Sequence, residues 1–300
     1  GQSDKSASKQ ALRASSTSHC RAECPHQGAG NSLLRQKYRD RMAHYFITGA
    51  SAGIGAALVT QLLQAGHIVS TVARRAERLR DLGVDFSDQY CALPADVSDT
   101  DAMHSAVESA CSALGPIDVA ILNAGIYTPQ NALDIDPRDY QRHMDINYMG
   151  VVNALPGVIA SMRAAGGGQI AITSSVAGWR GLPNAAAYGP TKAALISLAE
   201  SITFDLAPRN IDVRVICPGF VETEATLVND YEMPGIISSE KAATEILSGL
   251  KSNNFIIHFP RSFTRKISLL RWLPDRWFFR IVGKSTGHNL TPAKDGGDAK

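Results

Sequence analysis

From residue 42 to residue 260, short apolar segments alternate with segments of helical periodicity, and this alternation limits the folds open to the chain more than any other feature. Strands that alternate with helices of roughly 10–20 residues form parallel βαβ units, which pack into one sheet with helices on both faces. The sequence therefore predicts an α/β fold with a doubly wound parallel sheet, in a single domain. The predicted strands are 45–48, 67–72, 90–94, 117–122, 169–173, 212–217 and 255–258. The predicted helices are 53–64, 75–82, 101–114, 139–164, 186–208 and 240–250.

The composition excludes several classes of protein. A net charge of +2 over 300 residues does not provide the concentrated basic face of a nucleic-acid-binding protein. The five cysteines are scattered and odd in number, which is typical of a reducing compartment rather than of a disulfide framework. We find neither an apolar run of about 20 residues nor the apolar stretch of a secretory signal peptide. We therefore expect a cytoplasmic protein.

Residues 1–41 differ in composition from the domain that follows. They are rich in Ser, Ala, Gln and Gly and carry eight Lys or Arg against three Asp or Glu. This segment has too few apolar residues to offset the entropy of ordering it. We predict a disordered leader, or vector-derived sequence ahead of a start at Met42. Within it His19, Cys20, Cys24 and His26 lie close together, but zinc sites need a folded unit around the ligands, so we predict no metal site.

The segment 261–284 is basic and amphipathic. It holds seven Lys or Arg against the single acid Asp275, with large apolar and aromatic residues between them. Pro274 is expected to divide it into two short helices. One hypothesis is peripheral membrane contact, because basic and aromatic faces suit the headgroup boundary. The alternative is a helix pair packed over the pocket or against a neighbouring subunit. Residues 285–300 are polar and predicted to be disordered.

A glycine-rich segment, T-G-A-S-A-G-I-G at 48–55, follows the first predicted strand and opens the first helix. Gly49, Gly53 and Gly55 allow a sharp turn and a close approach of the backbone to a pyrophosphate, which the positive helix end would bind. At the end of the second strand, V-A-R-R at 72–75 contains no carboxylate to bind a ribose 2′-hydroxyl. Arg74 can instead bind a 2′-phosphate, which favours NADP(H) over NAD(H). The alternative is that Arg74 and Arg75 begin a solvated helix.

Tyr188 and Lys192 are spaced by four residues at the beginning of a predicted helix, so they lie on one face of it. An ammonium about 5 Å from a phenol favours tyrosinate by roughly 3 kcal/mol, or about two pK units. The alternative is an ordinary surface pair. Ser175 follows the predicted strand 169–173 at the sheet edge where such folds bind ligands, and Ser174 is a rival for its role.

These elements together resemble the short-chain dehydrogenase/reductase family over about residues 43–259. In the family's order, the matching elements are 48–55, D-V at 96–97, L-N-A-G at 122–125, Asn147 in D-I-N-Y, Ser175, Y-G-P-T-K at 188–192 and P-G-F-V-E-T at 218–223. Leu122 departs from the family, which often has Asn there. The resemblance implies a Rossmann fold and an NADP(H)-dependent oxidoreductase acting on CH–OH or C=O groups. It also implies a homodimer or homotetramer.

The resemblance implies a role for each matching residue. Tyr188 is the general acid and base, Lys192 lowers its pKa and holds the nicotinamide ribose, and Ser175 positions the carbonyl. Asn147 anchors a water that connects Lys192 to solvent. The residues implied to bind the cofactor are Gly49, Ser51, Gly53, Ile54, Gly55, Arg74, Asp96, Val97, Asn123, Ala124, Gly125, Tyr188, Lys192, Pro218, Gly219, Val221 and Thr223.

The segment 223–239 combines large apolar residues with Gly and Pro, which is typical of a mobile lid over a lipophilic substrate. The intact set of Asn147, Ser175, Tyr188 and Lys192 favours an enzyme. The second hypothesis is a catalytically silent dinucleotide-binding regulatory or scaffold protein, which has no need of all four. An epimerase or dehydratase of this fold usually has a larger C-terminal domain.

Overall fold

The computed structural model describes residues 42–226 and 233–288. The predicted leader 1–41, with the cluster from His19 to His26, lies outside the described residues, as do 289–300 of the predicted tail and 227–232 of the predicted lid.

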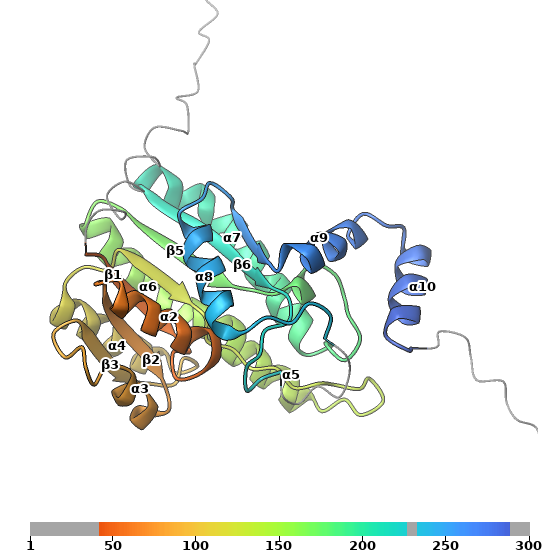
Figure 1. The fold of residues 1–300 in the computed structure, drawn as a ribbon, viewed down its shortest axis with the longest axis horizontal. Coiled ribbons are helices and arrows are strands. Elements are labelled where there is room, and N and C mark those ends of the chain that lie inside the picture. Colours follow the sequence, from red (N-terminus) through yellow and green to blue (C-terminus); the bar gives the residue numbers. More distant parts are fainter. Residues whose placement is uncertain (1–41, 227–232, 289–300) are drawn as a thin grey trace, which may run out of the picture.

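A seven-stranded parallel sheet forms the centre of the molecule (Figure 1), in the order β3-β2-β1-β4-β5-β6-β7. The order reverses between β1 and β4, so the sheet is doubly wound and the predicted Rossmann fold is confirmed. The strands are β1 (His44–Thr48), β2 (Ile68–Ala73), β3 (Tyr90–Pro94), β4 (Val119–Leu122), β5 (Gly168–Thr173), β6 (Ile211–Pro218) and β7 (Ile256–Phe259).

Helices cover both faces of the sheet (Figure 1). The α-helices are α2 (Gly53–Gln64), α3 (Ala76–Leu82), α4 (Thr100–Leu114), α5 (Pro137–His143), α6 (Gly150–Ala164), α7 (Tyr188–Leu206), α8 (Ser239–Leu250), α9 (Arg261–Leu270) and α10 (Asp275–Ser285). Apolar residues of α4, α6 and α7 form the core on one face, and those of α2, α3 and α8 form the core on the other. The two cores are large because both faces of each central strand are buried, as parallel sheets require.

The predicted helix 139–164 begins at Pro137 and is not uniform. The π-helix η1 (Met144–Met149) separates α5 from α6. Local π turns place one more residue in the turn and occur often at functional sites, and Asn147 lies in this one. Residue periodicity alone does not reveal such a turn, because the apolar pattern on either side continues.

The glycine-rich segment 48–55 packs without room for side chains. A Cβ on Gly55 would lie 2.2 Å from the Gly49 carbonyl oxygen, and a Cβ on Gly49 would lie 2.7 Å from the Cα of Ala124. Gly49 and Gly53 also have φ values of 69° and 54°, which L side chains rarely adopt. The turn therefore holds α2 close to β1 and β4.

The predicted division of 261–284 at Pro274 is confirmed, since α9 and α10 lie on either side of it. Arg180, which follows β5, joins the two helices. Its Nη1 donates to the carbonyl oxygens of Leu270 and Leu273 at 3.0 and 2.7 Å, and its Nη2 forms an ion pair with Asp275. Its guanidinium carbon also lies 3.9 Å from the ring centre of Phe278. Within 42–226 and 233–288, no helix has the length and apolar content needed to cross a bilayer.

Replacement of Gly55 by alanine is expected to lower the free energy of unfolding by about 3 kcal/mol, because the new Cβ would overlap a backbone oxygen that cannot move without displacing α2. Urea unfolding followed by circular dichroism measures this. Gly181→Ala is the matched control, since a Cβ there meets no atom within 4 Å. Equal unfolding midpoints for the two variants would contradict the packing described here.

Candidate active site

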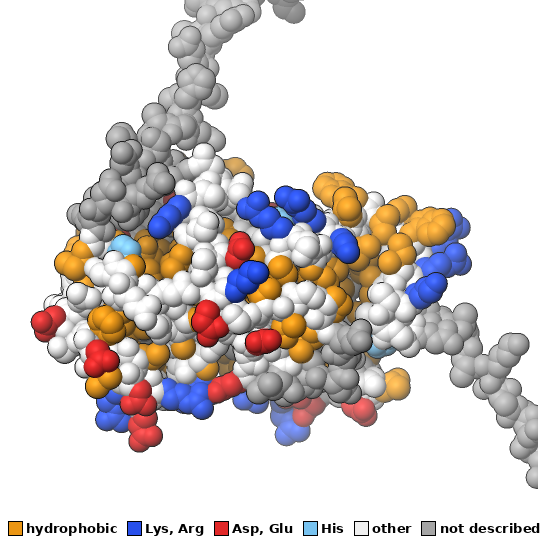
Figure 2. Space-filling model, in the orientation of Figure 1, with side chains coloured by type: hydrophobic (Ala, Val, Ile, Leu, Met, Phe, Trp, Pro, Cys, Tyr) orange, Lys and Arg blue, Asp and Glu red, His pale blue; other side chains and the backbone are white. Residues whose placement is uncertain are grey.

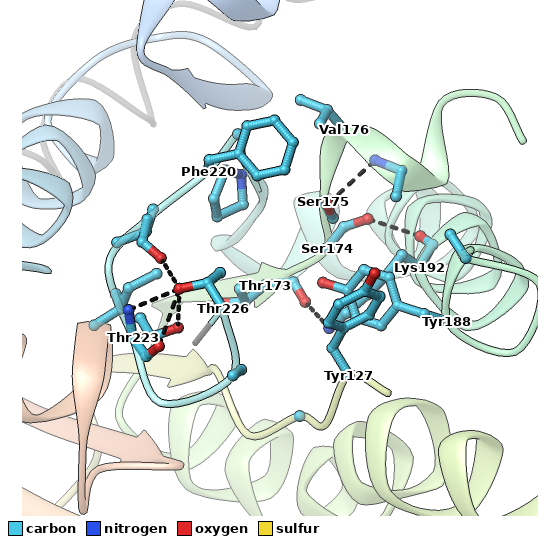
Figure 3. Close-up of a pocket in the computed structure, with 18 of the residues that line it drawn as sticks. Tyr127, Thr173, Ser174, Ser175, Val176, Tyr188, Lys192, Phe220, Thr223 and Thr226 are labelled. Carbon is cyan, nitrogen blue, oxygen red and sulfur yellow. Dashed lines mark hydrogen bonds between the residues drawn. The ribbon is translucent and has the colours of Figure 1, made fainter. Parts of the chain in front are cut away.

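A cavity of about 1340 Å³ lies at the carboxyl ends of β1, β2, β4, β5 and β6 (Figure 3). This is the edge where ligands bind in open parallel sheets, next to the reversal of strand order. All of the site residues predicted from the sequence line the cavity except Gly55 and Asn147. Gly55 packs the helix against the turn, and Asn147 is fully buried behind the cavity wall.

The glycine-rich turn and the first turn of α2 form one end of the cavity. Ala52 precedes α2 and provides no side-chain cap, so the first N–H groups of the helix have no side-chain acceptor from that residue. Gly49, Ser51, Gly53 and Ile54 line the cavity beside it. Free N–H groups and the positive end of a helix bind phosphate groups well. The arrangement therefore suits an anionic ligand.

Two arginines after β2 lie at the same end. Arg74 is exposed, and its Nη1 lies 3.9 Å from Oδ2 of Asp96. Arg75 donates from Nε to Ser51 Oγ at 3.0 Å and from Nη1 to Glu224 at 2.7 Å. Ser51 is thus held by Arg75. Glu224, in the segment after β6, also pairs with Arg78, so α3 holds the start of the predicted lid.

Asp96 and the segment 123–125 form the floor of the cavity. Desolvation raises the pKa of Asp96, but hydrogen bonds from Ser98 and the nearby Arg74 outweigh it, so the pKa is lowered overall. The backbone N–H groups of Asn123 and Ala124 donate to Thr48 Oγ1 at 3.0 and 3.1 Å. The end of β4 is therefore fixed against the end of β1.

Asn147 holds the backbone beside the cavity. Its Oδ1 accepts from Ile126 N at 2.7 Å, and its Nδ2 donates to Ile126 O and to Thr191 Oγ1 at 3.0 and 3.1 Å. A Cβ on Gly125 would lie 3.2 Å from Asn147 Oδ1 and 3.4 Å from Lys192 Nζ. Asn147 and Lys192 thus come together around Gly125, although they are 45 residues apart.

Lys192 is buried, with 3% of its surface exposed, and its Nζ lies 5.5 Å from the centre of the Tyr188 ring. The ammonium donates to the Thr173 carbonyl oxygen at 2.9 Å (Figure 3). The helix α7 places both side chains, as their spacing predicted.

Burial opposes the predicted effect of Lys192 on the pKa of Tyr188. Burial raises the pKa of Tyr188 to about 12, although its hydrogen bond with Ser175 acts in the opposite direction. Burial likewise lowers the pKa of Lys192 to about 8. Loss of water around both groups disfavours both charged forms. Sequence spacing contains no information on this desolvation.

The two serines after β5 have separate roles. Ser174 Oγ donates to the Lys192 carbonyl oxygen at 2.7 Å and is almost fully buried, so it ties β5 to α7. Ser175 lines the cavity, acts to lower the pKa of the neighbouring Tyr188, and accepts from Ala177 N at 3.2 Å. Ser175 therefore presents its hydroxyl to a ligand, and Ser174 does not compete for that position.

Several lining residues were missed by the sequence analysis. The Tyr127 ring meets the Tyr188 ring edge to face, with centres 5.2 Å apart (Figure 3). The ring centres of Phe220 and Phe263 lie 5.4 Å apart with their planes tilted by 41°, and Phe263 comes from α9. The hydroxyl of Thr173 is buried and has no hydrogen-bond partner among the described residues. An aromatic residue directly after N-A-G-I was the only available signal for Tyr127, and none existed for the contact of Phe263 with Phe220.

Comparison with known proteins identifies relatives over most of the domain. The short chain dehydrogenase family profile matches residues 43–232. A dehydrogenase/reductase SDR family protein 7-like from Anopheles gambiae is 33% identical over 257 residues, covering 79% of this chain and 81% of that protein.

Two solved structures share the fold. A short chain dehydrogenase from Burkholderia cenocepacia in complex with NADP has a TM-score of 0.72 and 24% identity, covering 84% of this chain and 99% of that chain. A 3-ketoacyl-(acyl-carrier-protein) reductase from Brucella melitensis complexed with NADH has a TM-score of 0.67 and 26% identity, covering 72% and 96%.

The buried ammonium predicts a specific pH dependence of stability. Between about pH 8 and 10.5 the unfolded chain retains a proton on Lys192 that the folded chain has lost, so stability rises with pH in this window. Relative to Lys192→Met, the wild-type free energy of unfolding should rise by about 3 kcal/mol across it. Urea titrations at several pH values measure the difference. Lys241→Met, on the exposed surface of α8, is the control. Parallel curves for wild type and Lys192→Met would show that Lys192 is not desolvated.

Proposed function

Because the chain belongs to the short-chain dehydrogenase family, we propose that it transfers a hydride between NADP(H) and a carbonyl or alcohol substrate, with Tyr188 as general acid and base. This family consists of oxidoreductases that bind a nicotinamide dinucleotide. The observation that carries the proposal is that Ser175, Tyr188 and Lys192 meet on the wall of a cavity (Figure 3) that the glycine-rich turn also lines.

The residues around the cavity fit a dinucleotide. Gly49 and Gly53 leave the backbone open to a pyrophosphate where any Cβ would overlap neighbouring atoms, and the start of α2 lacks a capping side chain. At the other end, the buried hydroxyl of Thr173 lacks a partner among the described residues, so a ligand could satisfy it. When bound, the nicotinamide supplies or accepts the hydride.

Tyr188 and Ser175 perform the proton chemistry in this proposal. Burial raises the pKa of Tyr188 to about 12, so the phenol holds the proton that a reduction requires. Tyr188 donates this proton to the substrate carbonyl oxygen, and Ser175 Oγ donates a hydrogen bond to the same oxygen as negative charge develops there.

In this proposal Lys192 binds and positions the cofactor. Its ammonium is fixed by the Thr173 carbonyl oxygen beside Gly125, one helical turn from Tyr188. We propose that it holds the nicotinamide ribose and that Asn147, which holds Ile126, keeps this wall in place. The water relay through Asn147 stays a prediction.

The preference for NADP(H) rests on the residues after β2. Arg74 and Arg75 line the cavity, and no carboxylate takes their place at the end of that strand. Arg75 is held by Ser51 and Glu224, and the guanidinium of Arg74 is largely exposed. Planar guanidinium groups bind phosphate oxygens in pairs. This arrangement supports binding of a 2′-phosphate.

The substrate is proposed to be lipophilic. Beyond the serine and the two tyrosines, the cavity wall is largely apolar, with residues from the segments that follow β5 and β6 and from α9. These residues are Val176, Leu182, Phe220, Phe263, Ile267 and Leu270. Such walls exclude water from the reacting carbonyl.

We also propose a reducing, cytoplasmic environment, because the described cysteines Cys91, Cys111 and Cys217 are all free. Burial raises the pKa of Cys217 to about 12, so this thiol is a core residue and not a nucleophile. Assembly into a dimer or tetramer stays a prediction.

Replacement of Tyr188 by phenylalanine is expected to lower kcat for reduction of lipophilic ketones by about 10²–10⁴-fold, because the proton donor is lost. NADPH binding should change little. NADPH absorbance measures turnover, and quenching of protein fluorescence measures binding. Tyr140→Phe is the matched control, since that phenol is buried without a partner among the described residues. Unimpaired reduction by Tyr188→Phe would refute the assignment. Cofactor binding by wild type without turnover of any carbonyl would indicate a silent binding protein.

Arg74→Ser and Arg75→Ser are each expected to weaken NADPH binding by about 10- to 100-fold, through loss of a charge-assisted hydrogen bond. NADH binding should be unchanged, because NADH has no 2′-phosphate. Dissociation constants of each variant for NADPH and for NADH measure the selectivity between the two cofactors. Arg78→Ser is the control, as Arg78 also pairs with Glu224 but does not line the cavity. Equal losses for NADH and NADPH would show that these arginines do not select between the cofactors.

A further inference from the structure

The outer side of the C-terminal helix pair carries an exposed apolar surface. We call it the C-terminal patch and define it by Leu269, Trp272, Trp277, Phe279 and Ile281 together with Arg276 and Arg280. Trp272 is 84% exposed and Leu269 is 70% exposed. Figure 2 shows hydrophobic and basic side chains gathered at the end of the molecule that Figure 1 labels α9 and α10. Large exposed apolar surfaces on soluble domains mark sites of interaction.

Basic groups surround the aromatic rings of the patch. The guanidinium carbons of Arg276 and Arg280 lie 5.7 and 5.9 Å from the ring centre of Trp277. The single acid of the segment, Asp275, is already paired with Arg180. The described part of the segment therefore presents a positive charge together with its apolar surface.

The exposure of the patch is not the result of a loosely attached helix pair. Arg180 binds the carbonyl oxygens of Leu270 and Leu273 and pairs with Asp275. The opposite side of α10 is buried through Phe278 and Val282, which are 2% and 7% exposed. The apolar residues that pack on the domain are thus different from those that face outward. The buried side of the helix pair accounts for the alternative prediction that these helices pack over the pocket. The exposed side has no partner among the described residues.

We propose that the C-terminal patch docks on an anionic lipid surface. Exposed tryptophans flanked by arginines suit the headgroup region, where rings enter the apolar boundary and guanidinium groups bind phosphates. A second copy of the chain fits less well, because a two-fold contact through this patch would bring Arg276 and Arg280 of both copies together. An anionic bilayer supplies the opposite charge.

Docking would place the mouth of the cavity at the lipid surface. Ile281 belongs to the patch and also lines the cavity, as do Ser285 and Thr286 beyond it. A lipophilic carbonyl compound dissolved in the bilayer then has a short path to Tyr188. This consequence for the substrate rests on the proposed function, whereas the docking itself does not.

Flotation of the full chain with vesicles tests the docking without cofactor or substrate. Phosphatidylcholine vesicles with phosphatidylserine should bind the protein, and pure phosphatidylcholine vesicles should bind it weakly. Arg276→Gln with Arg280→Gln should weaken binding on the order of thirtyfold, at about fivefold per basic side chain. Trp272→Ala with Trp277→Ala should weaken it at least about tenfold.

Matched controls distinguish the contribution of the C-terminal patch to binding from that of overall charge and surface hydrophobicity. Lys241→Gln with Lys251→Gln removes two exposed charges, one from the first turn of α8 and one directly after its last residue. Phe204→Ala removes an apolar side chain that is 82% exposed on α7. Both should bind like wild type. Every variant retains residues 1–41, so the basic composition of that segment cancels in the comparison.

Quenching of tryptophan fluorescence by brominated lipid shows whether the rings enter the bilayer. Strong quenching that is lost in Trp272→Ala with Trp277→Ala supports the proposal. Absence of binding to anionic vesicles, or binding that all patch variants retain, would overturn it. A patch variant that loses self-association instead, in analytical ultracentrifugation, would overturn it in favour of a second copy. None of these outcomes depends on enzymatic activity, so failure of the proposed function would not be mistaken for failure of the docking.

Discussion

The ammonium of Lys192 is buried at the carboxyl end of β5, and the arrangement of the cavity wall follows from how that charge is accommodated. Its Nζ donates to the Thr173 carbonyl oxygen, and Gly125 leaves the space that a side chain would otherwise take from it. Asn147 holds the adjoining backbone at Ile126. Burial lowers the pKa of Lys192 to about 8. The protein thus keeps a desolvated cation beside a phenol, an arrangement that costs stability and is common in catalytic sites.

The desolvation also explains why Tyr188 does not have the lowered pKa that its spacing from Lys192 suggested. Both side chains lose water on the same wall, and burial raises the pKa of Tyr188 to about 12. A neutral phenol hydrogen-bonded to Ser175 suits the delivery of a proton to a carbonyl oxygen. The same low polarity that opposes tyrosinate strengthens the hydrogen bonds that Ser175 and Tyr188 offer to a ligand.

The C-terminal helix pair contributes both to the cavity wall and to the exposed surface of the domain. Arg180 fixes α9 and α10 beside the cavity, so that Phe263 and Ile267 become part of the cavity wall. Trp272 and Trp277 are exposed and do not line the cavity. One short segment thus serves both as a wall of the pocket and as an exposed surface, and amphipathic helices serve both purposes when their two faces differ in composition.

The sequence by itself determined the topology of the sheet and most of the functional residues on the cavity wall. Strand and helix periodicity predicted the doubly wound order, because burial on both faces of parallel strands leaves a clear apolar pattern. The glycines at 48–55 and the spacing of Tyr188 and Lys192 are local features, and the structure places them as predicted.

Only the tertiary structure decided what depends on segments that are distant in the chain. The π-helix at Asn147, the pairing of Ser51 with Arg75, the contact of Phe263 with Phe220 and the pKa of Tyr188 belong to this group. Each depends on the distance, burial or competition of partners in space, and these quantities are set by the packing of the whole domain.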